Sequence, residues 1–437
     1  MPNENEFIGP EKIIDKKQKN MIPCVYHFYD EPMQLVKGEG KYLYDHQGKE
    51  YLDLFAGVSV MNCGHSHPEI TEAICEQVKS LQHTCTIYLN QPIVDLAEKL
   101  AEAAPGRLSK SFFCNSGTEA NEGSLLLSKL YTDNSEFIAL RQGLHGRTQL
   151  TMSLTGLSFW RTDPTPVGGI SFAPNAYCYR CQYGLEYPGC DLKCARAVRD
   201  VIETSTSKNV AAMIVEPIQG NGGIITPPPE YFKVLKEILD EYGILLIVDE
   251  VQTGFGRTGK MFAIENWDVE PDIMSVAKAL GNGTPIGAFI SRPEIADIYT
   301  RPGASTLGGN PVSSTAGLAT LNVIEKENLT ENAAKVGSYF KEKLKLLSEK
   351  HEMIGDVRGL GLMLGAELVK PGTDKVEATE ETDIVLEKMK NRGILIGKNG
   401  PGRNVLAFQP PLIIDKSDVD YLIENLDQVL ASLEKKQ

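Results

Sequence analysis

The chain has 437 residues, enough for a large hydrophobic core and for two or three domains. Hydrophobic residues make up 42% of it and charged residues 23%, which is typical of a soluble globular protein. With 44 basic against 58 acidic residues the net charge is -14, which argues against nucleic acid or an anionic membrane as a partner. No run approaches the roughly 18 apolar residues of a membrane span. The opening MPNENEFIGPEK lacks the apolar region of a signal peptide, so we expect a cytoplasmic protein.

Several segments predict helices or hairpins without chemistry of their own. Residues 41–54, KYLYDHQGKEYLDL, alternate around a DHQG turn and predict a β-hairpin near the start of a small domain. Residues 68–81 and 92–104 have apolar positions at helical spacing. An amphipathic helix is predicted over residues 417–434, with Ser417 as its N-cap.

A strand, a turn and a helix are predicted in sequence for FFCNSGTEANEGSLLLSKLY, which begins at Phe112. Gly117 and Thr118 fall where this helix begins. Free backbone N–H groups, the helix dipole and a hydroxyl therefore converge on one point. The pattern suits a bound phosphate, and it equally suits an ordinary N-cap.

Nine cysteines are an odd count for a disulfide framework, and four of them crowd into CYRCQYGLEYPGCDLKC. The four are Cys178, Cys181, Cys190 and Cys194. Thiols this close in sequence predict a site for a zinc ion or an iron-sulfur cluster. The central gap of eight residues is shorter than the usual zinc spacing, and free thiols or a disulfide are the alternatives.

Charged groups stand at the ends of two further strand-like runs. Residues 244–248 are apolar and residues 273–277 are apolar apart from Ser275, as in a parallel sheet buried on both faces. The two runs lead into Asp249 and Lys278. Ligands collect at the carboxyl ends of such strands, so the acid and the amine can face one site. Desolvation lowers the pKa of a lysine there and makes its amine ready for a Schiff base. Pyridoxal phosphate (PLP) needs such a lysine and an acid beside its ring nitrogen. The alternative is a strand-capping aspartate and a solvated lysine.

A nucleotide-binding interpretation of the same region fails on two points. GFGRTGK, residues 254–260, fits the pattern of a phosphate-binding loop. Met261 follows the loop where a magnesium-binding hydroxyl is required, and the acidic strand precedes the loop instead of following it.

VDEVQTGFGRTGK and the later SVAKALGNGTPIGA together resemble the signature of class-III aminotransferases. This PLP-dependent group of fold type I includes 4-aminobutyrate, ornithine and alanine-glyoxylate aminotransferases. The resemblance implies an α/β fold with a mostly parallel seven-stranded sheet flanked by helices in a large domain, and a small α+β domain from both ends of the chain. The expected parts are residues 1–60 of the small domain, residues 61–328 of the large domain with a cysteine-rich loop at 172–195, and residues 329–437 of the small domain.

The resemblance also implies roles for residues around the cofactor. Lys278 holds PLP covalently and carries a proton during catalysis. Asp249 binds the ring nitrogen, and Gln252 binds the ring hydroxyl. In SGTEAN, Gly117 and Thr118 bind the phosphate.

Two further motifs carry implied roles for the substrate and for the assembly. GLHGRT places Leu144 where the family has an aromatic residue stacked on PLP, and it places Arg147 on a substrate carboxylate. GASTLGGNP places Thr306 on the phosphate of a neighbouring subunit, and Ser305 near the substrate. We therefore expect a homodimer with shared active sites.

Two departures from the family pattern bear on specificity. Asn221 stands where relatives that use glutamate often have a glutamate, and Ala407 stands where they have a second arginine. Without that arginine a second carboxylate is left unpaired, at a cost of a few kcal/mol. We expect an ω-amino acid donor, such as 4-aminobutyrate or β-alanine, and pyruvate or glyoxylate as acceptor. An alanine-glyoxylate type, a PLP racemase or phospho-lyase, and a non-enzymatic metal carrier are the alternatives.

Overall fold

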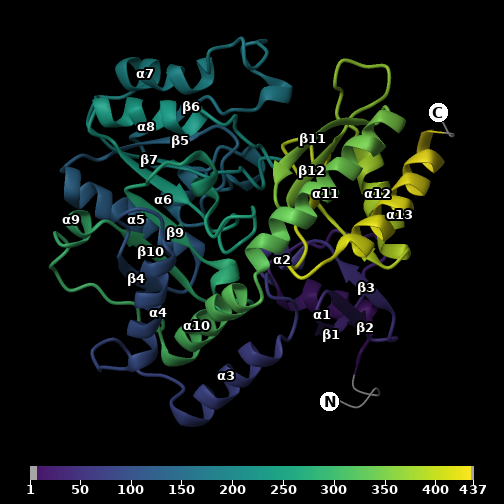
Figure 1. Cartoon of the computed structure of the whole chain (residues 1–437), viewed down its shortest axis with the longest axis horizontal. Coiled ribbons are helices and arrows are strands. Elements are labelled where there is room, and N and C mark those ends of the chain that lie inside the picture. The colour runs from purple at the N-terminus through teal and green to yellow at the C-terminus, as the bar shows by residue number, and fades with distance from the viewer. Residues whose placement is uncertain (1–6, 435–437) are drawn as a thin grey trace.

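A computed structural model of the chain describes residues 7–434, and its largest element is a seven-stranded sheet in the order β4-β10-β9-β8-β7-β5-β6 (Figure 1). Strands β9, β8, β7, β5 and β6 pair in parallel, and β10 is antiparallel to both of its neighbours. The predicted mostly parallel sheet is therefore confirmed. Its strands are β4 (Lys110–Cys114), β5 (Glu136–Leu140), β6 (Ile170–Ala173), β7 (Val210–Val215), β8 (Leu245–Asp249), β9 (Ile273–Val276) and β10 (Gly287–Ser291).

Helices cover both faces of this sheet, which explains the unbroken apolar runs of its central strands. Leu246 and Val248 of β8 pack in the same cluster as residues of α7 and α8, whereas Leu245 and Ile247 pack with residues of α5. Successive side chains of a strand point to opposite faces, so both faces are buried. The helices of this part are α3 (Pro68–Ser80), α4 (Gln91–Ala103), α5 (Gly117–Thr132), α6 (Gln149–Ser153), α7 (Lys193–Ser205), α8 (Tyr231–Glu241), α9 (Pro293–Ala296) and α10 (Pro311–Lys326).

The two ends of the chain come together beside the large sheet (Figure 1). One small sheet has the order β1-β2-β3-β13, in which the parallel pair of β3 and β13 joins the N-terminal hairpin to a C-terminal strand. A second small sheet has the order β11-β12-β15-β14. The strands are β1 (Leu35–Glu39), β2 (Tyr42–Asp45), β3 (Glu50–Asp53), β11 (Ile354–Leu360), β12 (Met363–Leu368), β13 (Ile394–Leu395), β14 (Gly397–Asn399) and β15 (Val405–Phe408). The helices are α1 (Pro10–Asn20), α2 (Ala56–Ser59), α11 (Leu329–Lys350), α12 (Thr379–Asn391) and α13 (Lys416–Glu434).

This arrangement confirms the predicted small α+β part built from both termini. We propose the boundaries 1–60, 61–328 and 329–437 for the N-terminal portion of the small domain, the large domain and the C-terminal portion. Within these ranges, residues 1–6 and 435–437 lie outside the described residues.

Local predictions were mostly confirmed, with one correction at the last helix. The hairpin forms from β2 and β3, and the two early helices appear as α3 and α4. Helix α13 begins at Lys416, so Ser417 lies inside its first turn and the predicted cap was wrong. Asp415 takes that role: its Oδ1 accepts hydrogen bonds from the backbone N–H groups of Ser417 at 2.7 Å and Asp418 at 3.2 Å.

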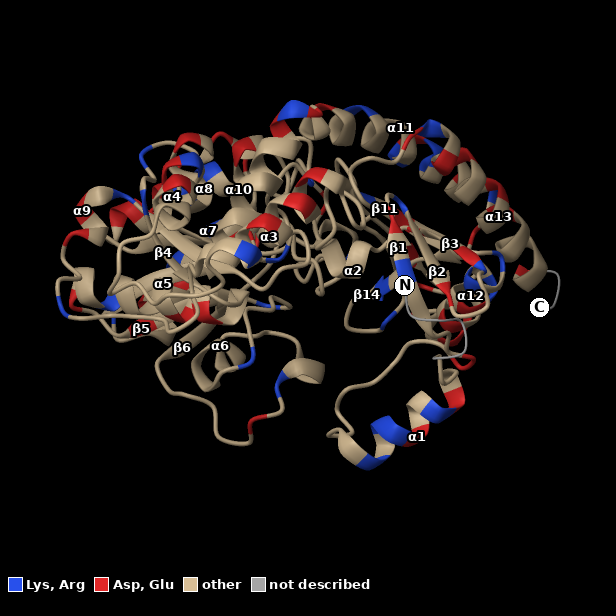
Figure 2. Cartoon of the chain, turned by 90° about the horizontal axis from the view of Figure 1, so that it is seen from below, with Lys and Arg blue, Asp and Glu red and all other residues tan. Residues whose placement is uncertain are grey.

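The outer helix α11 carries acidic and basic residues interspersed, whereas basic residues prevail in α1 and acidic residues in α13 (Figure 2). Between residues 7 and 434, none of the helices combines the length and the apolar character that a membrane crossing requires. The cytoplasmic location stays a prediction.

Candidate active site

A cavity of about 380 Å³ opens at the carboxyl ends of strands β7, β8 and β9. Asp249, the last residue of β8, and Lys278, two residues beyond the end of β9, both line it. The two strands are hydrogen-bonded neighbours, and Asp249 pairs with Ser275. The acid and the amine therefore face one cavity, whose volume lies in the range of about 300–1,000 Å³ that is usual for small-molecule sites.

Asp249 is buried and held by three donors. Its Oδ2 accepts hydrogen bonds from Asn121 Nδ2 at 2.8 Å and from His145 Nδ1 at 2.9 Å, and its Oδ1 accepts one from the backbone N–H of Val251 at 3.1 Å. Sequence reasoning missed Asn121 and His145. The available signals were that Asn121 lies one turn beyond Gly117 in α5 and that His145 belongs to GLHGRT.

Lys278 has an unusual backbone and a perturbed amine. Its φ of 46° lies in the left-handed region, which is strained for a residue with a side chain and occurs often at functional sites. Burial lowers the pKa of the amine, although the carboxylates of Asp249 and Glu216 act in the opposite direction. The lowered pKa makes the amine a better nucleophile near neutral pH, as predicted from the sequence.

The N-terminus of α5 opens into the same cavity. Ser116 is its N-cap, with Oγ accepting a hydrogen bond from the Glu119 N–H at 3.2 Å, while Gly117 and Thr118 line the cavity. A Cβ at Gly117 would lie 2.8 Å from Val251 Cγ1, so the close packing there requires glycine. Exposed N–H groups and the positive end of the helix dipole suit a phosphate.

Two loops supply the remaining predicted residues of the cavity wall. Residues 141–147 bring Leu144 and Arg147 to the cavity, and the side chain of Arg147 is exposed. Residues 219–223 bring Asn221 to it, and Gln252 lines it beside them. A Cβ at Gly220 would lie 1.5 Å from Gln252 Oε1, so this loop packs directly against Gln252.

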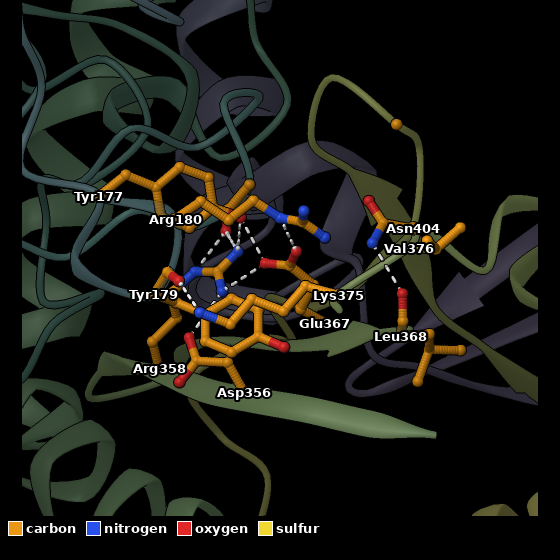
Figure 3. Close-up of polar contacts among 12 residues, drawn as sticks. Tyr177, Tyr179, Arg180, Asp356, Arg358, Glu367, Leu368, Lys375, Val376 and Asn404 are labelled. Atoms are coloured by element: carbon orange, nitrogen blue, oxygen red, sulfur yellow. Dashed lines mark hydrogen bonds and ion pairs between the residues drawn. The ribbon is translucent and has the colours of Figure 1, made fainter. Parts of the chain in front are cut away.

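A buried arginine, Arg358, supports the loop of residues 219–223 from outside the cavity, and its ionic contacts are drawn in Figure 3. Arg358 of β11 donates to the carbonyl oxygen of Gly223 through Nε at 2.9 Å and Nη2 at 2.6 Å. Through Nη1 it also donates to Glu367 Oε2 of β12 at 2.8 Å. The Tyr177 hydroxyl, from the cysteine-rich loop, bonds the same carboxylate. Three separate segments of the chain therefore meet at Arg358.

Three predicted residues lie outside the cavity wall of the single chain. Ser305 Oγ accepts a hydrogen bond from Asn115 Nδ2, which does line the cavity, at 3.2 Å. Thr306 is exposed. Ala407 of β15 is fully buried, and its partners in the neighbouring strands are Gly365 and Gly397.

The predicted metal site is not supported. The thiols of the cysteine-rich loop line one small cavity of about 20 Å³, and all four are free. Within the described part of the chain, however, no three or more His, Cys, Asp or Glu side chains are placed to hold a metal ion. Burial raises the pKa of Cys178 and raises that of Cys194 to about 11. The four are Cys178, Cys181, Cys190 and Cys194.

A partly buried lysine, an aspartate with a fixed orientation and a helix N-terminus share one cavity at the end of a parallel sheet. This set fits the aldehyde, ring nitrogen and phosphate of PLP, and the fold and site together define a PLP-dependent enzyme of fold type I. The family model for class-III aminotransferases matches residues 26–430. The chain belongs to this family, whose members use PLP, and the prediction of a PLP-dependent aminotransferase is confirmed.

Relatives and solved structures agree with this assignment. The chain is 45% identical to the mitochondrial alanine--glyoxylate aminotransferase 2 homolog 2 of Arabidopsis thaliana, over 98% of this chain and 89% of that protein. It is 39% identical to the leucine/methionine racemase of Thermococcus litoralis, over 97% of this chain and 96% of that protein. A crystal structure of a Bacillus anthracis aminotransferase matches with a TM-score of 0.90 at 33% identity, covering 97% of this chain and 98% of that one.

Proposed function

We propose that this enzyme moves an amino group from an ω-amino acid of the 4-aminobutyrate or β-alanine type to a 2-oxo acid, with pyruvate or glyoxylate as acceptor. The observation that carries the proposal is one cavity lined by Lys278, Asp249, the N-terminus of α5 and Arg147. The reaction is ping-pong, because donor and acceptor use the same site in turn.

PLP, when bound, supplies an electron sink for the carbon next to the reacting nitrogen. Lys278 would hold the cofactor through its amine, and the same amine would move a proton at the substrate carbon. Asp249 keeps the ring nitrogen protonated, with its orientation fixed by two side-chain donors. Gln252 holds the ring hydroxyl, and Leu144 covers the ring by dispersion without aromatic stacking.

Gly117 and Thr118 bind the phosphate in this proposal. Both line the cavity at the first turn of α5, where helix N–H groups have no partner within the helix.

Arg147 recognises the donor carboxylate. Its guanidinium offers the planar pair of N–H donors that fits a carboxylate, and its exposed side chain lies on the cavity wall. Ser305, hydrogen-bonded to Asn115 of the wall, is proposed to contact the substrate.

The choice of acceptor rests on Asn221 and Ala407, the two positions where relatives that use glutamate carry charged residues. Asn221 on the wall is neutral, and Ala407 is an apolar side chain between two glycines of neighbouring strands. A second carboxylate, as in 2-oxoglutarate, has no cationic partner at either position, so an unpaired charge weakens the binding of such an acceptor. The similarity to an alanine-glyoxylate aminotransferase homologue supports glyoxylate and makes alanine a rival donor.

We further propose a homodimer with shared active sites. Leu307 is 54% exposed beside Thr306, and Ile87, Tyr88 and Leu89 are 76%, 65% and 103% exposed. Large apolar side chains left in water support a partner surface. Thr306 is proposed to reach the phosphate bound by the second copy.

A donor and acceptor panel on the PLP-loaded enzyme tests the proposal. We expect turnover of 4-aminobutyrate or β-alanine with pyruvate or glyoxylate, and poor turnover with 2-oxoglutarate. Preferred use of 2-oxoglutarate would contradict the argument from Asn221 and Ala407. Turnover without any oxo acid would favour a racemase or phospho-lyase instead. This control is included because the relatives include a leucine/methionine racemase.

A variant separates carboxylate recognition from the chemistry. Arg147→Ala should raise KM for 4-aminobutyrate by about tenfold or more, the effect of losing a charge-assisted hydrogen bond. Butylamine, which lacks the carboxylate, is the matched control and should react equally with both forms. An equal loss with both amines would show that Arg147 serves the fold and does not recognise the donor.

A further inference from the structure

Glu216 is a buried carboxyl group at the cavity that none of the roles above uses. It follows strand β7, is 5% exposed and lines the cavity wall. Its Oε1 accepts a hydrogen bond from the backbone N–H of Leu144 at 2.8 Å. Its Oε2 accepts one from the backbone N–H of Gly220 at 2.9 Å.

These two bonds join the two loops that form the substrate side of the cavity. The first loop carries Leu144 and, three residues later, Arg147. The second carries Asn221, whose carbonyl oxygen accepts a hydrogen bond from the Gly400 N–H at 3.0 Å. Each oxygen of the carboxyl group therefore holds a different loop, and the single side chain of Glu216 sets the distance between the two loops.

We propose that Glu216 is a positioning residue of the transamination site, which holds the loop bearing Leu144 and Arg147 against the loop bearing Asn221. This inference rests on the proposed function, because it assigns Arg147 to the donor carboxylate. A displacement of Arg147 weakens substrate binding first, since Arg147 is the residue assigned to the donor carboxylate, whereas Lys278 lies just beyond the end of β9.

The two hydrogen bonds from Leu144 and Gly220 to Glu216, called the clamp below, depend on the charge of this carboxyl group. Burial raises the pKa of this carboxyl to about 7; the neighbouring charge of Asp249 acts in the same direction, and His145 opposes it. Lys278 is the other charged group that faces it. A protonated carboxyl has one O–H donor in place of an acceptor, so one of the two loop contacts is lost below pH 7. Donor binding should therefore weaken as the pH falls from 8 to 6.

The test compares Glu216→Gln with Glu250→Gln in the PLP-loaded enzyme. Glutamine keeps the size of the side chain but presents an NH2 group to one of the two N–H donors. Glu250 is the matched control, because it is equally buried and its pKa is also raised to about 7 by burial. It bonds Thr253 and the Ile264 N–H, and it does not line the cavity.

For Glu216→Gln we expect KM for 4-aminobutyrate to rise about tenfold, as for one lost hydrogen bond to a charged group, with a smaller change in kcat. The fall in kcat/KM between pH 8 and 6 should disappear. Glu250→Gln should keep the wild-type KM and pH profile. A wild-type KM and profile in Glu216→Gln, or the same changes in both variants, would overturn the proposal.

A second readout works without turnover. Binding of butyrate, a donor analogue without the amine, is followed through the absorption band of the bound cofactor. If the wild type binds butyrate but does not transaminate, the proposed reaction fails, while weaker butyrate binding by Glu216→Gln still supports the clamp. If the wild type binds no butyrate, the assignment of Arg147 fails and the clamp, which depends on it, is refuted with it.

Discussion

Replacing Asp249 with asparagine is the sharpest test of the cofactor site. Asn121 Nδ2 and His145 Nδ1 both point donors at Oδ2, at 2.8 and 2.9 Å. An asparagine will turn its only oxygen toward these two donors, because the opposite orientation sets its NH2 group against them. Its NH2 group then occupies the Oδ1 position, where it faces the single backbone N–H of Val251, and a donor stands where a protonated ring nitrogen would need an acceptor.

The size of the effect follows from the lost charge. Two opposite unit charges about 4 Å apart attract each other by about 4 kcal/mol at the effective dielectric of a protein site. This corresponds to about a thousandfold in rate. We therefore expect Asp249→Asn to lower kcat/KM by about 10³, measured with 4-aminobutyrate and pyruvate after saturation with PLP.

The control is another buried aspartate outside the cavity. Asp272 is 2% exposed, precedes β9, and lies 2.7 Å from the guanidinium of Arg292. Asp272→Asn should lower stability but leave kcat/KM of the folded enzyme within about threefold. A loss of less than about tenfold in Asp249→Asn, with the cofactor still bound, would refute the reasoning.

Three further predictions concern the cofactor, pH and packing. Leu144→Phe restores an aromatic ring beside the cofactor and should tighten PLP binding by about 0.5–1.5 kcal/mol, measured by equilibrium dialysis; unchanged affinity would contradict a stacking position there. The pKa of Glu250 rises from 4.5 to about 7 on folding, so the native state binds this proton more tightly and the wild type loses stability as the pH rises through that window. Glu250→Gln should remove up to about 3 kcal/mol of that loss, so its free energy of unfolding in urea should differ less between pH 5 and pH 8 than that of the wild type. The same pH dependence of the unfolding free energy in both proteins would refute this prediction. Arg257 is fully buried and donates to the carbonyl oxygens of Leu362 at 3.0 Å and Pro410 at 2.5 Å, so Arg257→Leu should destabilise the fold by about 3 kcal/mol, and an unchanged thermal midpoint would contradict that.

The strands that carry the chemistry were predictable because their signals are local. A mainly apolar run indicates a strand buried on both faces, and Asp249 and Lys278 directly follow two such runs. The N-cap of α5 also belongs to a short segment. The class-III motifs then fixed the family without any contact between distant residues.

Contacts between distant segments lay beyond such reasoning. Asn121 and His145 reach Asp249 from 128 and 104 residues away, and no spacing rule links them. Glu216 directly follows strand β7, yet its two loop contacts depend on how both loops return to the sheet. The cysteine spacing indicated a metal, but the fold places the thiols around a small cavity without the geometry of a metal site.

The sequence alone was enough to predict the family, the parallel sheet and the positions of the reactive lysine and its partner acid, because each of these rests on a short pattern of residues. The tertiary structure decided how that acid is oriented, which carboxyl joins the substrate loops and whether the thiols converge on a metal. Those outcomes depend on distances between segments that only the packed chain brings together.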